Sequence, residues 1–285
     1  MEKGSLYVVA TPIGNLADMT FRAVQILQSV ELIAAEDTRR SATLLTHYDI
    51  KTPSTSYHDF TRPEKRQQLL RKILAGSNVA LISDAGTPGI ADPGYRLVSE
   101  AVALGIEVAA IPGPSVLTSA LSVSGLATNA FFFSGYLPQG AGPRTRALES
   151  LKTRVETLVL YEAPHRCLAS LEAMHTVLGN RRIAVAREMT KRHEETFRGT
   201  IQEALNHFRG KERIRGELTL VVEGAGDSGN PANDCDLART VRRMIKEAKL
   251  TRKDAVRMVS IALEVPRNQV YRASLQNEEN ETNTG

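Results

Sequence analysis

Short apolar runs, rich in valine, isoleucine and leucine, recur along this chain and alternate with stretches whose apolar residues fall at helical spacing. The apolar runs predict eight strands, at Leu6–Ala10, Leu32–Ala35, Val79–Ile82, Val108–Ile111, Phe131–Ser134, Leu158–Tyr161, Ile183–Ala186 and Leu218–Val222. The helical spacing predicts helices near residues 20–29, 64–75, 94–104, 115–123, 143–152, 165–178 and 200–208. Strands that alternate with helices are typical of an α/β protein with largely parallel sheets.

The number of strands indicates two α/β domains, because eight strands exceed a typical single sheet. The polar stretch 124–129, which contains a glycine, is the predicted boundary between them. Residues 1–124 then form an N-terminal α/β domain, and residues 125–224 form a second one. The stretch 225–236 has the composition of a linker.

The residues after this linker are more basic than the two predicted domains. Residues 237–275 contain ten lysines and arginines and three acidic residues. Leucine, valine and isoleucine recur there at helical spacing, and Thr251 followed by Asp254 predicts a helix cap. One face of that helix is predicted to carry Ala255, Val259 and Ala262. Pro266 can open a third short helix, so the segment resembles a small helix-turn-helix module. The polar residues 276–285 are predicted to be disordered.

Loops rich in glycine and proline follow several of the predicted strands. The segment 80–94 reads ALISDAGTPGIADPG, and similar loops follow the first strand at 10–16 and another strand at 111–115. Ligands of open α/β sheets bind beyond the carboxyl ends of the strands, so these loops predict a small-molecule cleft. The glycine fingerprints of dinucleotide and P-loop sites are absent, which argues against a ligand held by its phosphates. Alternatively, Pro12 and Gly14 only form a turn, and Ser115 only caps a helix.

Charged residues gather at three other predicted strand ends, in AAEDTRR, YEAPHR and REMTKRHEE. One interpretation places Lys191 and Arg166 at an anionic substrate, with Glu188 or Glu194 positioning a hydroxyl. The other interpretation is a solvated surface with local ion pairs. Asp37 similarly either caps the next helix or lies in the cleft, where Arg39 and Arg40 would reach phosphates.

Composition narrows the function only a little. The net charge of +4 is compatible with a polyanionic partner without requiring one, and two cysteines make a disulfide framework improbable. A reducing cytoplasm fits this composition best, and we expect neither a signal peptide nor a membrane span. The histidines lack the paired spacing of zinc sites, so no metal is expected. The nucleophile elbow of α/β-hydrolases is also absent.

Taken in order, the motifs VATPIGNLADMT, AAEDTRR, SDAGTPGIADPGY, IPGPS, YEAPHR and REMTKRHEE resemble those of the bacterial 16S ribosomal RNA 2′-O-ribose methyltransferases. These enzymes belong to the tetrapyrrole-methylase superfamily, and the resemblance covers about residues 5–224. The basic module resembles the helix-turn-helix at their C-terminus. The resemblance implies two α/β domains of the tetrapyrrole-methylase type with a cofactor cleft between them, and S-adenosyl-L-methionine (SAM) as methyl donor without a metal.

The resemblance also implies a target and site residues. The target would be the ribose of a decoding-centre cytidine, cytidine 1402 by the usual numbering, in 16S rRNA within the small ribosomal subunit. The enzyme would be a cytoplasmic homodimer. The implied cofactor-binding residues are Pro12, Ala85, Gly86, Thr87, Ile90, Ser115, Val116, Glu162 and Met189. The catalytic candidates are Glu188, Lys191 and His165, and the RNA-binding candidates are Arg39, Arg40, Arg166, Arg192, Arg242, Arg243 and Lys253.

This sequence departs from the tetrapyrrole enzymes at three matched positions, with Thr87 in place of their aspartate, Glu162 in place of their methionine and Met189 in place of their glycine. Three alternatives stay open at this point. The chain could methylate a small tetrapyrrole on carbon, although the basic clusters suit a polyanion better. It could be a non-catalytic nucleic-acid-binding protein, although this gives the strand-end loops no purpose. The last helices could also dock another protein.

Overall fold

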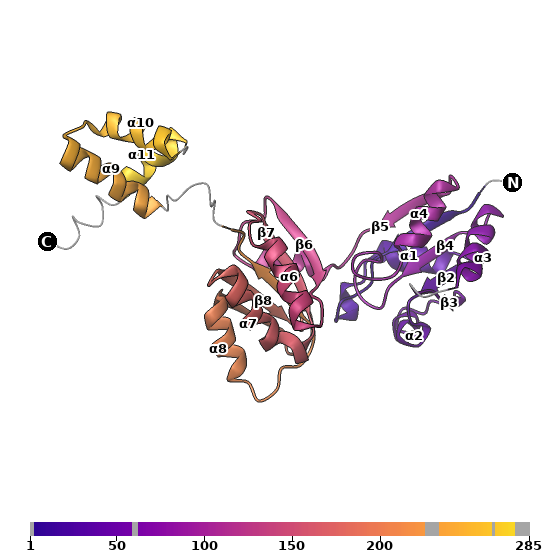
Figure 1. The fold of residues 1–285 in the computed structure, drawn as a ribbon. Coiled ribbons are helices and arrows are strands. Elements are labelled where there is room, and N and C mark those ends of the chain that lie inside the picture. Colours follow the sequence, from indigo (N-terminus) through magenta and orange to yellow (C-terminus); the bar gives the residue numbers. More distant parts are fainter. Residues whose placement is uncertain (1–2, 59–61, 226–233, 264–265, 277–285) are drawn as a thin grey trace. The chain divides into compact units, whose positions relative to one another are not determined.

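The computed structural model describes residues 3–58, 62–225, 234–263 and 266–276 (Figure 1). Contacts within the chain separate two compact units. One contains the residues up to 149 together with 157–222, and the other contains 150–156 together with the residues after 222. The first unit holds two five-stranded sheets, each with its own helices. These sheets carry the α/β pattern that the sequence predicts.

All strand pairs of the first sheet are parallel, with the order β3-β2-β4-β1-β5. Its strands are β1 (Ser5–Val9), β2 (Leu32–Ala35), β3 (Ser54–Ser56), β4 (Val79–Ile82) and β5 (Glu107–Ile111). The intervening helices are η1 (Leu16–Asp18), α1 (Phe21–Ser29), α2 (Thr38–His47), α3 (Pro63–Leu74), α4 (Tyr95–Ala103) and α5 (Val116–Val123). Parallel strands place every one of their carboxyl ends at the same edge of the sheet.

The first sheet is buried on both faces because successive side chains of a strand point to opposite sides. Ile33 and Ala35 pack in one core cluster with residues of α1 and α2. Ala34, between them, packs in another cluster with residues of α3 and α4. This burial explains why β2 and β4 read as continuous apolar runs rather than as alternating patterns.

The second sheet is mixed, with the order β6-β7-β10-β8-β9. Its strands are β6 (Phe131–Tyr136), β7 (Thr157–Glu162), β8 (Arg182–Arg187), β9 (Glu195–Thr200) and β10 (Leu218–Val222), and its helices are α6 (Ala141–Leu151), η2 (Pro164–Arg166), α7 (Cys167–Leu178) and α8 (Ile201–Arg209). β6 and β7 are parallel, whereas β10 is antiparallel to both of its neighbours and β9 is antiparallel to β8. The expectation of largely parallel sheets is therefore wrong for this half.

The antiparallel central strand has a consequence for the site. Leu218, the first residue of β10, lies opposite both Glu162 and Arg187, the last residues of β7 and β8. Two strand ends and one strand start therefore meet at one sheet edge. α5 packs against the second sheet, where Leu121 shares a cluster with Val159 and neighbouring residues.

The sequence pattern missed α2, β3 and β9. β3 is three residues long and consists of serine and threonine, and β9 reads ETFRGT. α2 buries Leu44 and Leu45, but its first half is polar. Each of these elements lacks the continuous apolar run or the full apolar stripe on which the predictions depended.

The C-terminal helices are α9 (Asp234–Ala248), α10 (Arg252–Ala262) and α11 (Arg267–Gln276), and they pack around a small core of their own. The Thr251 hydroxyl accepts a hydrogen bond from the amide of Asp254, so the predicted cap is confirmed. Ala262 is exposed and Val256 is buried instead, which corrects the predicted face of α10. α11 begins one residue after Pro266.

Most of the predicted linker and nearly all of the predicted tail lie outside the described residues. No helix in the described part of the chain is both long and apolar enough to cross a membrane.

Candidate active site

The strand-end loops of the first sheet and the β10 edge of the second sheet line one cavity of about 240 Å³. Its lining includes residues that the sequence singled out, namely Arg40, Ala85, Gly86, Thr87, Ile90, Ser115, Val116, Glu188, Met189 and Lys191. It also includes residues that the sequence reasoning assigned no role, among them Glu36, Asp84, Asp92, Tyr136, Tyr161 and Glu217. Loops that are far apart in sequence therefore converge on one place.

The loop after β4 is fixed to the loop after β1 by backbone pairing. Thr11 and Gly86 exchange two amide-to-carbonyl hydrogen bonds of 2.8 and 2.9 Å. The Thr11 hydroxyl also donates to the carbonyl oxygen of Ser83 at 3.1 Å. Gly86 has a φ of +79°, in the left-handed region that favours glycine. The backbone at Ala85 and Gly86 is thereby held against the cavity.

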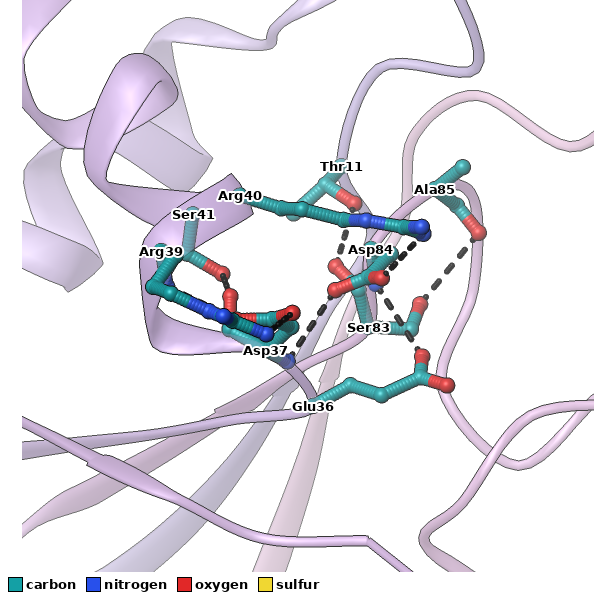
Figure 2. A network of polar contacts seen from close by, with 9 residues as sticks. All are labelled: Thr11, Glu36, Asp37, Arg39, Arg40, Ser41, Ser83, Asp84 and Ala85. Carbon is teal, nitrogen blue, oxygen red and sulfur yellow. Dashed lines mark hydrogen bonds and ion pairs between the residues drawn. The ribbon is translucent and has the colours of Figure 1, made fainter.

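A polar network joins the end of β2 to the end of β4 (Figure 2). The Asp84 carboxylate accepts from the amide of Asp37 at 3.1 Å and from the Arg40 guanidinium at 2.8 Å. The amide of Asp84 in turn donates to the Glu36 carboxylate at 3.2 Å. Figure 2 shows the Arg40 side chain extended over Asp84, so its guanidinium is already engaged at the cavity wall.

Asp37 caps α2, as one of its two interpretations predicted. Its carboxylate accepts from the amide of Arg39 at 2.9 Å. The side chain of Arg39 also donates to this carboxylate and lowers its pKa. Arg39 itself is 90% exposed and does not line the cavity.

Ser115 precedes α5, but its hydroxyl makes no capping hydrogen bond to that helix. The alternative in which the side chain of this serine only caps the helix is therefore wrong. The residue lines the cavity together with Val116. Its hydroxyl is available there to a ligand.

The turn after β8 presents a second wall. Lys191 donates to the Glu188 carboxylate at 2.8 Å, and both Glu188 and Thr190 have positive φ values. Gly14 lies directly against this turn, because a Cβ at Gly14 would stand 2.5 Å from Cγ of Lys191 and 3.0 Å from the carbonyl oxygen of Met189. The loop after β1 and the turn after β8 are therefore in close contact.

The cavity is acidic. Among its described lining residues, five carry carboxylates (Glu36, Asp84, Asp92, Glu188 and Glu217), and two carry cationic groups (Arg40 and Lys191). Burial, together with repulsion from Glu36, Glu217 and Asp84, raises the pKa of Asp92 to about 7, against a hydrogen bond with Ser83. Such a lining suits a ligand that carries positive charge.

Two tyrosines close the second-sheet side of the cavity. Their rings meet edge to face, with centroids 5.6 Å apart. Burial and then the neighbouring carboxylates raise the pKa of Tyr136 to about 12, and burial and then Asp92 raise the pKa of Tyr161. Both hydroxyls therefore keep their protons at neutral pH and can donate a hydrogen bond to a ligand.

Four proposed residues of the site lie elsewhere. Glu162 is fully buried, where its carboxylate pairs with Arg166 at 3.1 Å and accepts from the Ser170 hydroxyl. Arg166 also donates to the carbonyl oxygen of Leu137, so it is turned inward and not toward a polyanion. His165 is exposed on η2 and Pro12 is buried, and neither lines the cavity.

The spacing of Arg166 and Ser170 after Glu162 is a signal for these contacts that the sequence analysis missed. Residues four and eight positions after the end of a strand can lie on one face of the following helix, above that strand end. The remaining basic candidates lie on the surface. Arg192 is exposed beyond the turn after β8, and Arg242, Arg243 and Lys253 are exposed on α9 and α10. Among the described residues, no group of three or more side chains could hold a metal ion.

Comparisons with known proteins agree with this architecture. Residues 5–205 match the family of Tetrapyrrole (Corrin/Porphyrin) Methylases. The chain is 49% identical over 274 residues to a Ribosomal RNA small subunit methyltransferase I of Synechocystis sp., covering 96% of this chain and 98% of that one. It is 42% identical over 274 residues to the protein of the same name from Halalkalibacterium halodurans, covering 95% and 94%.

Among solved structures, a uroporphyrin-III C-methyltransferase from Thermus thermophilus, complexed with S-adenosylhomocysteine, superposes with a TM-score of 0.54. The two chains are 18% identical, and the match covers 76% of this chain and 97% of the other. At this identity the likeness concerns the fold alone.

Proposed function

Because the chain belongs to the tetrapyrrole (corrin/porphyrin) methylase family, in the group of ribosomal RNA small subunit methyltransferases I, we propose that it transfers a methyl group from SAM to a ribosomal RNA of the small subunit. The acceptor is the 2′-hydroxyl of a decoding-centre cytidine. The observation that carries the proposal is an identity of 42–49% with relatives of that name over nearly the whole chain. The aligned length spans the loops that line the cavity.

The lining of the cavity is compatible with SAM. A sulfonium and an ammonium on this cofactor outweigh its single carboxylate, and the described lining has more carboxylates than cations. The backbone of Ala85 and Gly86, the side chains of Thr87 and Ile90, and the Ser115 hydroxyl would hold it, with Val116 and Met189 beside them. Pro12 and Glu162 act at a distance, by supporting the loops that carry these residues.

SAM supplies an electrophilic methyl group, and the transfer is an in-line displacement. The main task of the protein is therefore alignment, which can lower a barrier by about 7–11 kcal/mol in favourable cases. Lys191 is engaged by Glu188, so we assign this pair to orienting the ribose or an adjacent phosphate. His165 lies away from the cavity and is given no part in the chemistry.

The RNA would be bound outside the cavity. Arg192, Arg242, Arg243 and Lys253 are exposed and can contact phosphates, whereas Arg166 is held in its pair with Glu162. Arg39 and Arg40 stand at the start of α2 beside the cavity and could meet the phosphates flanking the target. We further propose a cytoplasmic homodimer that acts on RNA within the small subunit.

The test is ribose-methylation mapping of small-subunit RNA from cells with and without this gene. We expect one 2′-O-methylcytidine at the decoding centre to disappear with the gene and to return with the wild-type chain. An unchanged map would contradict the RNA target. Methylation of a uroporphyrinogen-type substrate instead would favour the tetrapyrrole alternative, and failure to bind SAM in calorimetry would favour a non-catalytic protein.

A further inference from the structure

One row of residues across the second sheet faces the cavity. Tyr136 of β6 lies opposite Tyr161 of β7. Thr219 of β10 lies opposite both Tyr161 and Ala186 of β8. Residues directly opposite one another on paired strands share one face of a sheet, and all four of these residues line the cavity. Tyr136 therefore stands at one end of the row, on a strand at the edge of the sheet (Figure 1).

A β-bulge turns Tyr136 toward the cavity. The pairing of β6 with β7 shifts by one residue between Phe133 and Gly135, and Gly135 has a φ of +67°. In a regular strand, side chains three positions apart point to opposite faces. Here Phe133 and Tyr136 both contact the ring of Tyr161, with centroids 4.9 and 5.6 Å away. The bulge is therefore what brings the Tyr136 ring onto the cavity face.

The backbone that follows Tyr136 is fixed as well. Arg166 donates a hydrogen bond to the carbonyl oxygen of Leu137 and pairs with the Glu162 carboxylate at 3.1 Å. Glu162 is fully buried at the end of β7 and accepts a hydrogen bond from the Ser170 hydroxyl. The ring of Tyr136 is thus held by the bulge before it and by this buried ion pair after it.

Tyr136 keeps much of its surface free despite this fixed position. Its side chain is 45% exposed, so part of the ring can be reached by a ligand that enters the cavity. A ring that is already ordered loses little conformational entropy when it binds. Phe131, at the other end of β6, is 42% exposed but does not line the cavity. Exposure alone therefore does not distinguish Tyr136, whereas its place at the cavity does.

The charges of the cavity indicate which part of an RNA would meet this ring. Carboxylates outnumber cations in the described lining, and both cations are paired with carboxylates, so the lining repels phosphates. A nucleobase is uncharged, and unstacked bases of RNA bind on aromatic side chains. The SAM-binding residues that we assign, such as Ala85, Gly86 and Ser115, belong to loops of the first sheet. Tyr136 belongs to the second sheet and is left for the acceptor.

We propose that Tyr136 is a binding residue for the acceptor, whose ring stacks on the base of the target nucleotide and so aligns the ribose hydroxyl with the methyl donor. This inference rests on the proposed function. A ribose can enter the cavity only if its base leaves the stack of the RNA, which costs free energy. Stacking on Tyr136 offsets part of that cost and fixes the nucleotide for the in-line transfer.

The experiment measures methylation of small subunits from cells that lack the gene, at varied subunit concentration and saturating radiolabelled SAM. Tyr136→Ala should lower kcat/KM for the subunit about 5–100-fold, the range expected for loss of one base–aromatic stack. Tyr136→Phe keeps the ring and should stay close to wild type. Tyr136→Leu keeps the apolar bulk without a flat ring, so it should resemble Tyr136→Ala. Calorimetry should find the SAM affinity unchanged in all three variants.

The bulge provides a second test in which the tyrosine itself is kept. A Cβ at Gly135 would have no atom within 4 Å, so Gly135→Ala acts only through the strained left-handed backbone. It should lower kcat/KM in the same direction as Tyr136→Ala. Gly135→Asn should recover most of the activity, because asparagine tolerates this conformation better than alanine does. Phe131→Ala is the matched control and should leave kcat/KM unchanged.

Several outcomes would overturn the inference. These are a Tyr136→Ala chain with the wild-type kcat/KM, and equal losses in Tyr136→Ala and Phe131→Ala. A loss of SAM affinity in Tyr136→Ala that matches its loss of rate would assign Tyr136 to the cofactor instead. In each of these cases the wild-type chain still labels the RNA, so the proposed function stands. If the wild-type chain binds SAM but labels no ribosomal RNA, the proposed function fails and this inference fails with it.

Discussion

Single residues decide how closely the loops of the cavity approach one another. Gly14 is the clearest case, because it contacts the turn after β8 with no room for a side chain. Glycine at position 86 is favoured for a different reason, its left-handed backbone, and its pairing with Thr11 keeps the loop after β4 in place.

Gly14→Ala should separate the loop after β1 from the turn at Met189 and Lys191. The added Cβ meets a backbone oxygen as well as a side chain, so we expect destabilisation of about 1–3 kcal/mol. SAM affinity should fall as well, because Met189 and Lys191 line the cavity. Thermal unfolding and calorimetric titration with SAM measure the two effects.

Gly142→Ala is the control for this prediction. Gly142 lies in α6, and a Cβ added there would stand 3.7 Å from its nearest neighbour, the Arg146 guanidinium. Alanine at this position should leave SAM binding unchanged, because Gly142 does not line the cavity. Equal losses of affinity in the two variants would contradict the steric argument.

Asp92 also has a predictable effect on stability. Its pKa is raised in the folded chain from 3.8 to about 7, so folding favours the protonated form. The stability it contributes is complete below about pH 4 and is lost as pH rises through about 7. Asp92→Asn should therefore raise the unfolding temperature more at pH 8 than at pH 5. A uniform shift at both pH values would show that charge is not the cause.

At the scale of elements, a cluster of charges ties β9 to β8 and α8. The Glu195 carboxylate lies 2.9 Å from Arg187, 2.7 Å from His207 and 2.9 Å from Lys211. Burial opposes its ionisation, but the hydrogen bonds from Lys211, His207 and Arg187 outweigh this and lower the pKa of Glu195 to about 2. β9 is an edge strand, so this cluster helps to fix it.

Glu195→Gln should destabilise the chain by about 1–3 kcal/mol at pH 7, because charged hydrogen bonds are lost. A depressed pKa gives stability that is present above about pH 4.5 and is lost as pH falls through about 2. The difference from wild type should therefore shrink as pH is lowered from 5 toward 2. Denaturant unfolding at several pH values measures it.

Glu172→Gln provides the comparison. Glu172 pairs with Arg209 at 2.7 Å, but both side chains are about half exposed, at 53% and 51%. Exposed pairs contribute about 0–1 kcal/mol, so this variant should be much milder. If the two variants are equally destabilising, the cluster at Glu195 has no special role.

At the scale of the whole molecule, the three C-terminal helices have a core of their own, separate from the cores of both sheets. Their basic residues, including Arg242, Arg243 and Lys253, lie on the outside. This arrangement suits a module that adds RNA affinity without contributing to the cavity.

A chain with Arg242→Gln, Arg243→Gln and Lys253→Gln should bind small-subunit RNA with a weaker dependence on salt. Each lost phosphate contact removes about 0.7–0.9 from the slope of log affinity against log salt, so three contacts change it by about 2–3. SAM affinity should be unchanged, because these residues do not line the cavity. An unaltered slope would exclude the module as an RNA contact and favour docking of another protein.

The sequence by itself determined the strands of both sheets other than β3 and β9, and the loops that carry the site. Buried strands such as β2 and β4 need continuous apolar runs, and loops such as 83–94 need glycine and proline, so both leave local marks in the sequence. The parallel order of the first sheet then predicts that its loops share one edge. Gly86, Ile90 and Ser115 could be placed at the cavity for that reason.

Only the tertiary structure decided which polar side chains enter the cavity. Glu162 and Glu217 look alike in sequence, but one is buried beneath η2 and the other lines the cavity. The reason is the antiparallel β10, which sets the start of that strand opposite the ends of β7 and β8. Pairing between distant strands leaves no local pattern in the sequence. The same is true of the burial and the neighbouring carboxylates that raise the pKa of Asp92.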